Sequence, residues 1–329
     1  MKQRLPIPGF VDLQVNGFEG VDFSRAGLTE AEAYIAFRSL LGMGTAAFLA
    51  TVITSPLEVY ERNLPLIARA LARPEFRGRV LGIHIEGPFI SAEPGAVGAH
   101  DARFVRPPDA ALLARLIELG QGTVRLLTVA PEIPGADRLI RDAVGKGVAV
   151  SIGHTLASEL DLAKAAAAGA TALTHLGNGL PNQVHRHINP VWAGLANDAL
   201  TAMIITDGHH LPPALIKTII RAKGVDRIVV VSDASPAAGL PPGRYQLLGN
   251  DAVLEPSGRL HNPAKQCLVG SSATMVQCMT HLVSLGIVSL DELLQVGFFN
   301  PLRLIGAPPA SVPAGPGMCF DPVARRFET

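Results

Sequence analysis

Short apolar segments that each end in one polar, metal-capable side chain are the feature that most restricts how this chain folds. One is LGIHIEGPF at positions 81–89, where Glu86 ends the apolar run, and two later segments end in His154 and His175. A buried strand gains nothing from an unpaired Glu or His at its end, because desolvating such a group costs about 2–7 kcal/mol. Several such endings, from distant segments, predict strand ends that converge on one polar centre.

Apolar, β-rich segments alternate with helical patterns along most of the chain. The expected strands are 7–15, 45–54, 80–85, 124–129, 149–153, 172–175, 202–206 and 227–232. The expected helices are 29–41, 57–72, 109–119, 136–145, 157–168 and 212–223. This alternation predicts an α/β fold with a parallel sheet covered on both faces. Eight strands are what a closed (β/α)8 TIM-type barrel needs. An open doubly wound sheet is the alternative, although no GxGxxG turn follows the first strand.

Helix start and stop signals support this assignment of helices. Thr29 followed by Glu32 is typical of a capping box, and Gly145 and Gly169 stand where helices should end.

The pattern changes after Ser232. Gly- and Pro-rich segments with short strand-like pieces such as 245–248 lead to expected helices at 272–285 and 290–296, and we expect Asn300-Pro301 to end the second. We therefore expect a barrel over residues 1–306 with a short C-terminal helical extension, and a tail over 307–329 that packs on the barrel.

Composition excludes several classes of function. Hydrophobic residues make up 48% of the 329 positions and charged residues 17%, which fits a compact enzyme-sized protein. The 28 basic and 28 acidic residues balance, so we expect neither nucleic acid nor a membrane as partner. The three cysteines form no CxxC pair, and no secretory signal or apolar span is visible. These features favour a cytoplasmic protein.

The ends of the predicted strands carry a set of polar side chains that would meet at one end of a barrel. They are Gln14 and Asn16, Glu86, His154, His175, His210 and Asp233. Taken singly, each fits a hydrogen-bonded structural residue, and Asp233 also fits a helix N-cap. Together, Glu86 and the two histidines form a three-ligand set that suits zinc and leaves a position open for water or substrate. His84 shares the strand face of Glu86, and we interpret it as a packing or supporting histidine.

Six motifs in order carry a resemblance to a known family. They are PGFVDLQVNG at 8–17, GIHIEGP at 82–88, GHT at 153–155, THLGN at 174–178, DGHH at 207–210 and SDA at 232–234. Over about residues 8–274 the chain resembles N-acetylglucosamine-6-phosphate deacetylases of the amidohydrolase superfamily. In that superfamily the first strand usually ends in His-x-His, whereas this chain has Gln14 and Asn16 there, a substitution also found within the deacetylases. Amides are poor ligands for a zinc-type ion, so we expect a vestigial second site and one divalent metal per chain.

The resemblance implies roles for the strand-end residues. Glu86, His154 and His175 would be the metal ligands, Asp233 the general base and then acid, and His210 a group that polarises the amide carbonyl. We expect Zn²⁺ in the site, although Fe²⁺ suits the same ligands. The implied reaction is hydrolysis of the acetamide of N-acetyl-D-glucosamine 6-phosphate, which gives glucosamine 6-phosphate and acetate.

The resemblance also implies how the rest of the substrate is bound. Asn178, Gly179 and Arg186 would hold the sugar phosphate, and in the family the arginine reaches the partner's site, so a homodimer follows. Two loops match substrate-contacting loops more weakly, one with Ala99 and one with Leu268, Val269 and Gly270. The second, Gly-Ser-Ser before a helix, equally fits an ordinary helix cap.

The chain departs from the family at its ends. Family members usually carry about fifty residues before the first barrel strand that form a small β-sandwich with the C-terminal segment, and we expect this sandwich to be missing or vestigial here. Two alternatives to the leading function stay open. One is a metal-dependent deacylase of another N-acyl sugar or amino acid, and the other is a catalytically silent sugar-phosphate binding protein.

Overall fold

Eight parallel strands form the centre of the molecule in the computed structural model, which describes residues 4–313 and 317–328. Around the barrel they are β2 (Phe10–Val15), β5 (Thr45–Ile53), β6 (Val80–Glu86), β7 (Val124–Val129), β8 (Ala149–Ile152), β9 (Ala172–Leu173), β10 (Thr201–Ile205) and β11 (Ile228–Val231). All eight of the segments expected from the sequence are strands. Almost every residue in them is buried, because side chains fill the barrel interior on one face and meet helices on the other.

The barrel is nearly closed. The last strand, β11, does not form a ladder with β2, but a parallel bridge joins Val15 to Ala234 just beyond it. The backbone N–H of Asn16 donates to the carbonyl of Ala234 at 2.7 Å, and that of Ser232 donates to Oδ1 of Asp12 at 3.1 Å. Closure therefore takes place at the carboxyl ends of the first and last strands.

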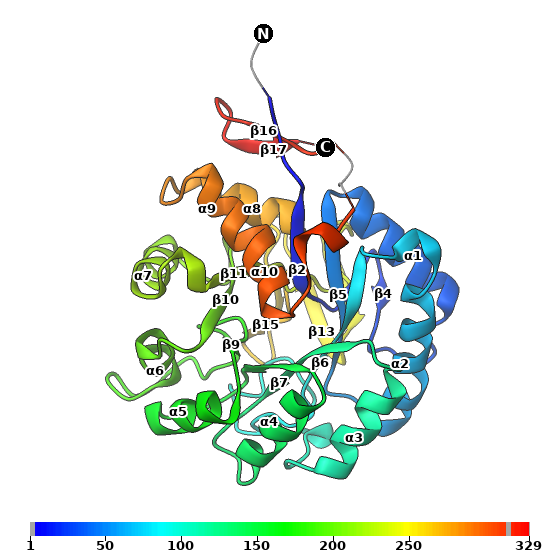
Figure 1. The fold of residues 1–329 in the computed structure, drawn as a ribbon, viewed down its shortest axis with the longest axis vertical. Helices are drawn as coiled ribbons and strands as arrows, with labels where there is room; N and C mark the ends of the chain where they lie inside the picture. The colour runs from blue at the N-terminus through cyan, green and yellow to red at the C-terminus, as the bar shows by residue number, and fades with distance from the viewer. Residues whose placement is uncertain (1–3, 314–316, 329) are drawn as a thin grey trace.

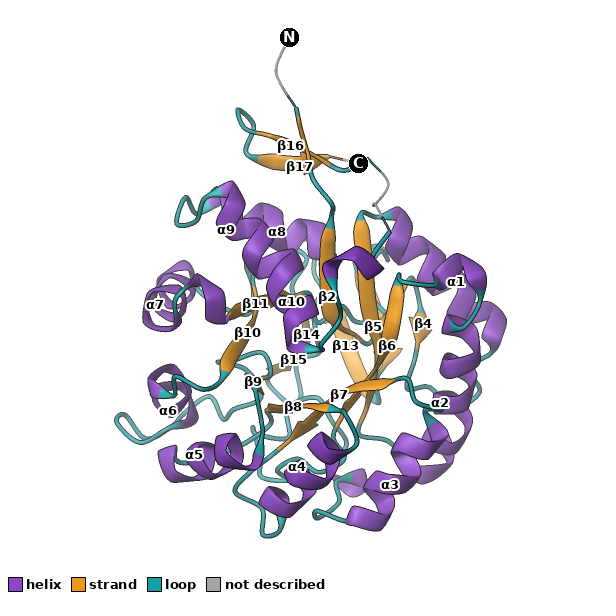
Figure 2. Ribbon diagram, in the orientation of Figure 1, coloured by secondary structure: helices purple, strands orange, loops and turns teal. Residues whose placement is uncertain are grey.

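Helices form a ring around the strands (Figure 1 and Figure 2). They are α1 (Glu30–Gly42), α2 (Leu57–Leu71), α3 (Ala110–Leu119), α4 (Ala136–Gly145), α5 (Glu159–Ala168), α6 (Pro190–Ala196) and α7 (Pro213–Lys223), with short 3-10 turns η1 (Pro74–Phe76), η2 (Ala102–Phe104), η3 (Val225–Arg227) and η5 (Pro309–Ser311). The Thr29–Glu32 capping box is present, and Gly169 ends α5 in the left-handed conformation. Helix α6, of seven residues, was not expected from the sequence.

The C-terminal helices correct one prediction. They are α8 (Met275–Ser284), α9 (Leu290–Leu294), the π-helical segment η4 (Gln295–Phe299) and α10 (Asn300–Leu304). Asn300-Pro301 does not end the helix, because the π segment precedes it and places Pro301 in the first turn of α10, where its missing N–H costs little. The side chain of Asn300 donates to the carbonyls of Val225 and Ile228. Among the described residues, no helix is long and apolar enough to cross a membrane.

Two antiparallel units that follow strands of the barrel were not expected. One is a four-stranded sheet of β12 (Gly243–Leu247), β13 (Asn250–Leu254), β14 (Leu260–Asn262) and β15 (Cys267–Leu268), of which the sequence indicated only the first strand. The other is the hairpin of β3 (Gly17–Phe18) and β4 (Val21–Asp22). Buried residues of the four-stranded sheet pack with Ile53 of the barrel, so this sheet lies against the carboxyl end of β5.

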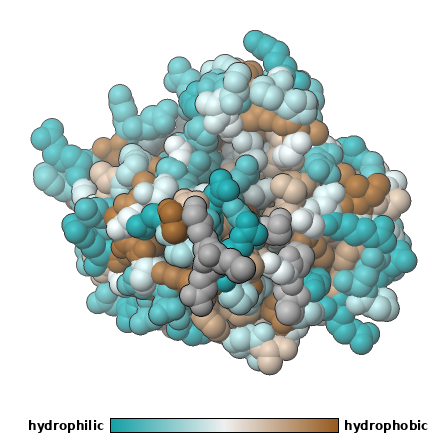
Figure 3. Space-filling view, turned by 90° about the horizontal axis from the view of Figure 1, so that it is seen from above, coloured by the Kyte–Doolittle hydropathy of each residue, from teal (hydrophilic) through white to brown (hydrophobic). Residues whose placement is uncertain are grey.

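A three-stranded sheet joins the two ends of the chain. Strand β1 (Leu5–Pro6) pairs with β16 (Cys319–Asp321), which pairs with β17 (Arg326–Glu328). The ring of Phe327 meets that of Phe10 edge-on at 4.8 Å, which ties the sheet to the first barrel strand. Seen from above Figure 1, the end of the molecule that carries this sheet shows mostly hydrophilic residues, with hydrophobic residues in small groups between them (Figure 3).

Candidate active site

Three metal-capable side chains meet at the carboxyl ends of three barrel strands. Glu86 is the last residue of β6, and His154 and His175 each lie two residues beyond the ends of β8 and β9. Oε1 of Glu86 lies 3.3 Å from Nε2 of His154 and 3.0 Å from Nε2 of His175, and the two Nε2 atoms are 3.1 Å apart. The predicted convergence of these strand ends is therefore present in the structure.

The backbone turns sharply where these side chains leave the strands. His154 has a φ of 50° and His175 a φ of 31°, and Asp233, just after β11, has a φ of 52°. Non-glycine residues rarely adopt positive φ, and such strain concentrates at functional sites. All three bends occur at the same end of the barrel, so the same positive-φ conformation directs three polar side chains to its mouth.

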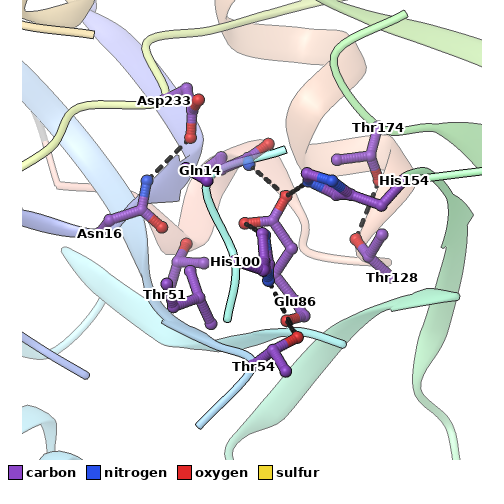
Figure 4. Close-up of polar contacts among 12 residues, drawn as sticks. Gln14, Asn16, Thr51, Thr54, Glu86, His100, Thr128, His154, Thr174 and Asp233 are labelled. Atoms are coloured by element: carbon purple, nitrogen blue, oxygen red, sulfur yellow. Dashed lines mark hydrogen bonds and ion pairs between the residues drawn. The ribbon is translucent and has the colours of Figure 1, made fainter. Parts of the chain in front are cut away.

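Hydrogen bonds from outside the trio orient it for metal binding. Nδ1 of His154 lies 2.9 Å from the carbonyl of Ala96, which leaves Nε2 with its lone pair facing Glu86. The amide of Gln14 donates to Oε1 of Glu86 at 2.8 Å (Figure 4). Burial alone would raise the pKa of Glu86, but hydrogen bonds with His154 and His175 hold it well below its usual value. These buried Glu and His side chains could hold a metal ion.

Asp233 lies beside this cluster and is held from the first strand. Asn16 Nδ2 donates to Oδ1 of Asp233 at 2.8 Å (Figure 4). Burial, followed by the charge of Glu86, raises the pKa of Asp233 to about 6. The preceding Ser232 is bound by the buried carboxylate of Asp12 through both its backbone N–H and its hydroxyl. The carboxylate just beyond β11 is thus held by Asp12 of β2 and by Asn16, the residue that follows β2.

His210 approaches from the loop after β10. Its Nδ1 lies 2.8 Å from Oδ2 of Asp207, which also accepts the hydroxyl of Ser271 at 2.8 Å. Burial would raise the pKa of Asp207, but the hydrogen bond and charge of His210 hold it below its usual value. Asp207 is therefore a carboxylate that fixes the ring and leaves Nε2 of His210 available to a ligand.

A cavity of about 460 Å³ opens over these groups. Of the residues predicted from the sequence, it is lined by Asn16, Glu86, Ala99, His154, His175, Asn178, Gly179, His210, Asp233, Leu268 and Gly270. Gly179 is required by close approach, because a Cβ there would lie 3.0 Å from Nδ1 of His154. Gln14 lies fully buried behind Glu86 rather than in the wall.

Two predicted substrate residues lie elsewhere. Val269 is fully buried and packs in the small core beneath the four-stranded sheet, so its side chain does not reach the cavity. Arg186 is exposed and does not line the cavity of its own chain; its carbonyl accepts a hydrogen bond from the indole of Trp192 at 3.0 Å.

Two other residues that line the cavity were not predicted as site residues. The ring of His100 stacks edge-on against that of His154 at 4.2 Å, and its Nε2 lies 3.8 Å from Oε2 of Glu86. Burial, and then the charge of His154, hold the pKa of His100 well below its usual value. Arg259, from the turn between β13 and β14, also lines the cavity. His84 supports the site from below, with Nε2 2.8 Å from Oγ1 of Thr128.

Comparison with known proteins decides the family. No family model matches the chain. The Bos taurus protein named N-acetylglucosamine-6-phosphate deacetylase is 36% identical over 312 residues, which are 91% of this chain and 74% of the relative. The chain belongs to the N-acetylglucosamine-6-phosphate deacetylase family.

Other deacetylases of this kind agree with that assignment. An Escherichia coli O157:H7 protein named N-acetylgalactosamine-6-phosphate deacetylase is 32% identical over 92% of this chain and 78% of the relative. A variant of the Mycobacterium smegmatis N-acetyl-D-glucosamine-6-phosphate deacetylase, solved in complex with N-acetyl-D-glucosamine 6-phosphate, superposes with a TM-score of 0.88 at 29% identity, over 98% of this chain and 84% of that one. The barrel and the family predicted from the sequence are confirmed, and the roles of single residues stay predictions.

Proposed function

We propose that this member of the deacetylase family hydrolyses the acetamide of N-acetyl-D-glucosamine 6-phosphate to glucosamine 6-phosphate and acetate. The observation that carries the proposal is the meeting of Glu86, His154 and His175 with a held carboxylate, Asp233, around one cavity. A metal-capable set and an adjacent base are what amide hydrolysis by an activated water requires. The names of the relatives point to the same reaction.

One divalent metal per chain, Zn²⁺ in preference to Fe²⁺, fits the residues present. The ligand atoms of the Glu-His-His set all lie within 4.8 Å of one another, which suits a small ion. Gln14 and Asn16 turn their amide N–H groups toward carboxylates, so they act as hydrogen-bond donors and do not build a second site. A bound divalent metal supplies Lewis acidity, which lowers the pKa of a water and polarises a carbonyl oxygen.

Asp233 moves the protons in this scheme. Its pKa of about 6 leaves it ionised at neutral pH, and Asn16 holds Oδ1 while Oδ2 stays available to accept a proton. Asp233 takes one proton from the attacking water and passes it to the amide nitrogen as the C–N bond breaks. The second proton of the water stays on the new carboxyl group and is released to solvent or to the amine, so the products are the amino sugar and acetate.

His210 would stabilise the substrate carbonyl. Because Asp207 binds Nδ1, a protonated ring presents its Nε2–H to the cavity, where it can donate to the oxygen that gains negative charge. We assign the sugar ring to the loops with Ala99, Asn178, Gly179, Leu268 and Gly270, all of which line the same cavity. Val269 would contact the sugar through its backbone alone, because its side chain is buried.

We propose a homodimer in which Arg186 reaches the cavity of the partner. Large apolar side chains near Arg186 are exposed, with Ile188 at 71% and Trp192 at 52%, as in a surface that a second copy covers. Light scattering on the purified protein tests this assignment. We expect a dimer that Trp192→Asp dissociates, and a wild-type monomer at micromolar concentration would contradict it.

We propose the cytoplasm as the compartment. All three cysteines are free thiols, as is usual where the environment is reducing. Fractionation with a tagged chain tests this, and recovery outside the cytoplasm would contradict it.

Acetate release from three sugars tests the proposed function. N-acetylglucosamine 6-phosphate, its unphosphorylated form and N-acetylgalactosamine 6-phosphate are compared with metal content measured on the same sample. We expect fast release from the first sugar with about one metal per chain. Preference for the second or third sugar would transfer the assignment to another N-acyl sugar. Binding of a sugar phosphate without any release would mark a silent binding protein.

A further inference from the structure

Arg259 is the one lysine or arginine among the described residues that line the active-site cavity. The other basic side chains in the wall are histidines: three lie within 3.8 Å of the carboxylate of Glu86, and the fourth, His210, is paired with Asp207. Arg259 lies on the turn between β13 and β14, part of the four-stranded sheet that the sequence did not predict. The sequence pattern therefore did not predict that Arg259 lines the cavity.

The turn that carries Arg259 is fixed to the mouth of the barrel. Nε2 of His209 lies 3.0 Å from the carbonyl of Ser257, and the hydroxyl of Ser272 donates to the carbonyl of Gly258 at 2.6 Å. His209 precedes His210, which lines the cavity. Two hydrogen bonds thus hold the backbone immediately before Arg259 beside the proposed catalytic groups.

Most N–H donors of the Arg259 guanidinium are not used in hydrogen bonds with the described residues. Its NH1 donates to Oε1 of Glu255 at 3.1 Å, the one partner found for it among the described residues. Arginine carries five N–H donors in a planar fork, so most remain available to a ligand. The same oxygen of Glu255 lies 3.0 Å from Nε2 of His261, so Glu255 balances two basic groups.

Charge is distributed unevenly between the floor and the mouth of the cavity. The floor holds the carboxylates of Glu86 and Asp233, both almost fully buried, whereas the side chain of Arg259 is 47% exposed. A divalent metal on the Glu-His-His set would balance the two floor carboxylates, so an anionic substituent is attracted to the guanidinium at the mouth. A substrate with an amide at one end and an anion at the other would enter amide first.

We propose that Arg259 binds the phosphate of the substrate from within the same chain. Its planar fork matches two oxygens of a sugar phosphate monoester, and the fixed turn presents it at the mouth while the acetamide reaches the floor. This inference rests on the proposed function, and it adds an anion-binding residue to the one expected from the partner subunit. Glu255 occupies one donor of Arg259 until the phosphate arrives.

Kinetics of matched variants test the proposal. Arg259→Ala should raise KM for N-acetylglucosamine 6-phosphate by at least about tenfold, the effect of losing a charged hydrogen bond. Its kcat and its kcat/KM on the unphosphorylated sugar should stay within about twofold of wild type, since neither involves phosphate binding. Glu255→Gln removes the same ion pair but spares the guanidinium, so it should not raise KM. Arg244→Ala, an exposed arginine on β12 outside the cavity, is the control and should behave as wild type.

Three results would overturn the proposal. Equal losses in Arg259→Ala and Glu255→Gln would show that the pair only stabilises the turn, and equal losses on both sugars would exclude phosphate recognition. An unchanged KM in Arg259→Ala, with a raised KM in Arg186→Ala, would place the phosphate on Arg186 alone.

Calorimetric binding of glucose 6-phosphate separates this proposal from the proposed reaction, because this ligand has no acetamide. Wild-type binding that Arg259→Ala abolishes supports the anion site even if no acetate is ever released. Deacetylation by the wild type, together with undiminished binding in Arg259→Ala, would refute the anion site and leave the reaction standing.

Discussion

The amide of Gln14 donates a hydrogen bond to Oε1 of Glu86 across a distance of 2.8 Å. That oxygen is the same atom that faces Nε2 of both His154 and His175. Gln14 of β2, at a position where the wider superfamily has a histidine, therefore orients the carboxylate of Glu86 at the end of β6. Gln14 acts on the site through Glu86.

Gln14→Leu should weaken metal binding. The variant keeps the bulk of the side chain but removes the N–H that orients Glu86, and loss of such a supporting bond typically costs ten- to hundredfold in metal affinity. Competition with a chelator measures the dissociation constant. Gln183→Leu, an exposed residue outside the cavity, is the control. Equal affinities in the two variants would contradict a supporting role for Gln14.

Asp233→Asn should abolish most turnover and leave the metal in place. The amide cannot accept a proton, and a general base contributes about 10²–10⁴-fold to the rate. Asp233 is not part of the Glu-His-His set, so the metal content of the variant should match that of wild type. Acetate release and metal analysis on one sample give both values. Undiminished kcat in the variant would remove Asp233 from the mechanism.

Asp12 should make stability depend on pH. Burial raises its pKa from 3.8 to about 7, although hydrogen bonds from Ser232 oppose the shift. Below pH 4 the carboxyl is protonated in both states. Between about pH 4 and pH 7 the unfolded chain releases the proton while the folded chain keeps it, so stability falls as pH rises, by at most about 4 kcal/mol.

The variant Asp12→Asn isolates this effect, because it has no group to titrate at this position. Urea unfolding at a series of pH values gives the free energy of unfolding of both proteins. The advantage of wild type over the variant should shrink from pH 4 to pH 7 and then level off. A difference that is constant with pH would show that Asp12 keeps an ordinary pKa.

Phe327→Ala should destabilise the protein by about 3 kcal/mol. The ring is buried between Phe10, at 4.8 Å, and Phe320, at 5.1 Å, so its removal leaves a cavity where the terminal sheet meets the barrel. Val323→Ala is the control, because Val323 lies in the same hairpin but is 67% exposed. Thermal unfolding of both variants measures the difference. Equal melting temperatures would mean that the tail does not support the barrel.

The sequence predicted the barrel and the strand-end site because both depend on local pattern. Apolar strands of the right length that end in polar residues such as Glu86, His154 and His175 give the same sequence pattern in any barrel of this kind, since the carboxyl ends of parallel strands meet at one end. The six motifs, in their order along the chain, then indicated the family. What the pattern did not contain was the conformation at the bends, where positive φ at His154 and His175 turns the side chains inward.

The remaining features depend on contacts between distant segments. The four-stranded sheet was missed because its strands are short and the segments around them are Gly- and Pro-rich, so pairing and not local propensity holds it together. Arg259 could not be foreseen as a cavity residue for that reason. The continuation of the helix through Asn300 depends on the carbonyls of Val225 and Ile228, which are more than seventy positions away.

Removal and return of the metal tests the central claim most directly. Acetate release from N-acetylglucosamine 6-phosphate is measured on the protein after treatment with a chelator and again after titration with Zn²⁺. We expect the stripped protein to lose activity and to regain it in full at about one equivalent per chain, as one Glu-His-His set requires. Hydrolysis at an undiminished rate by the stripped protein would contradict the account.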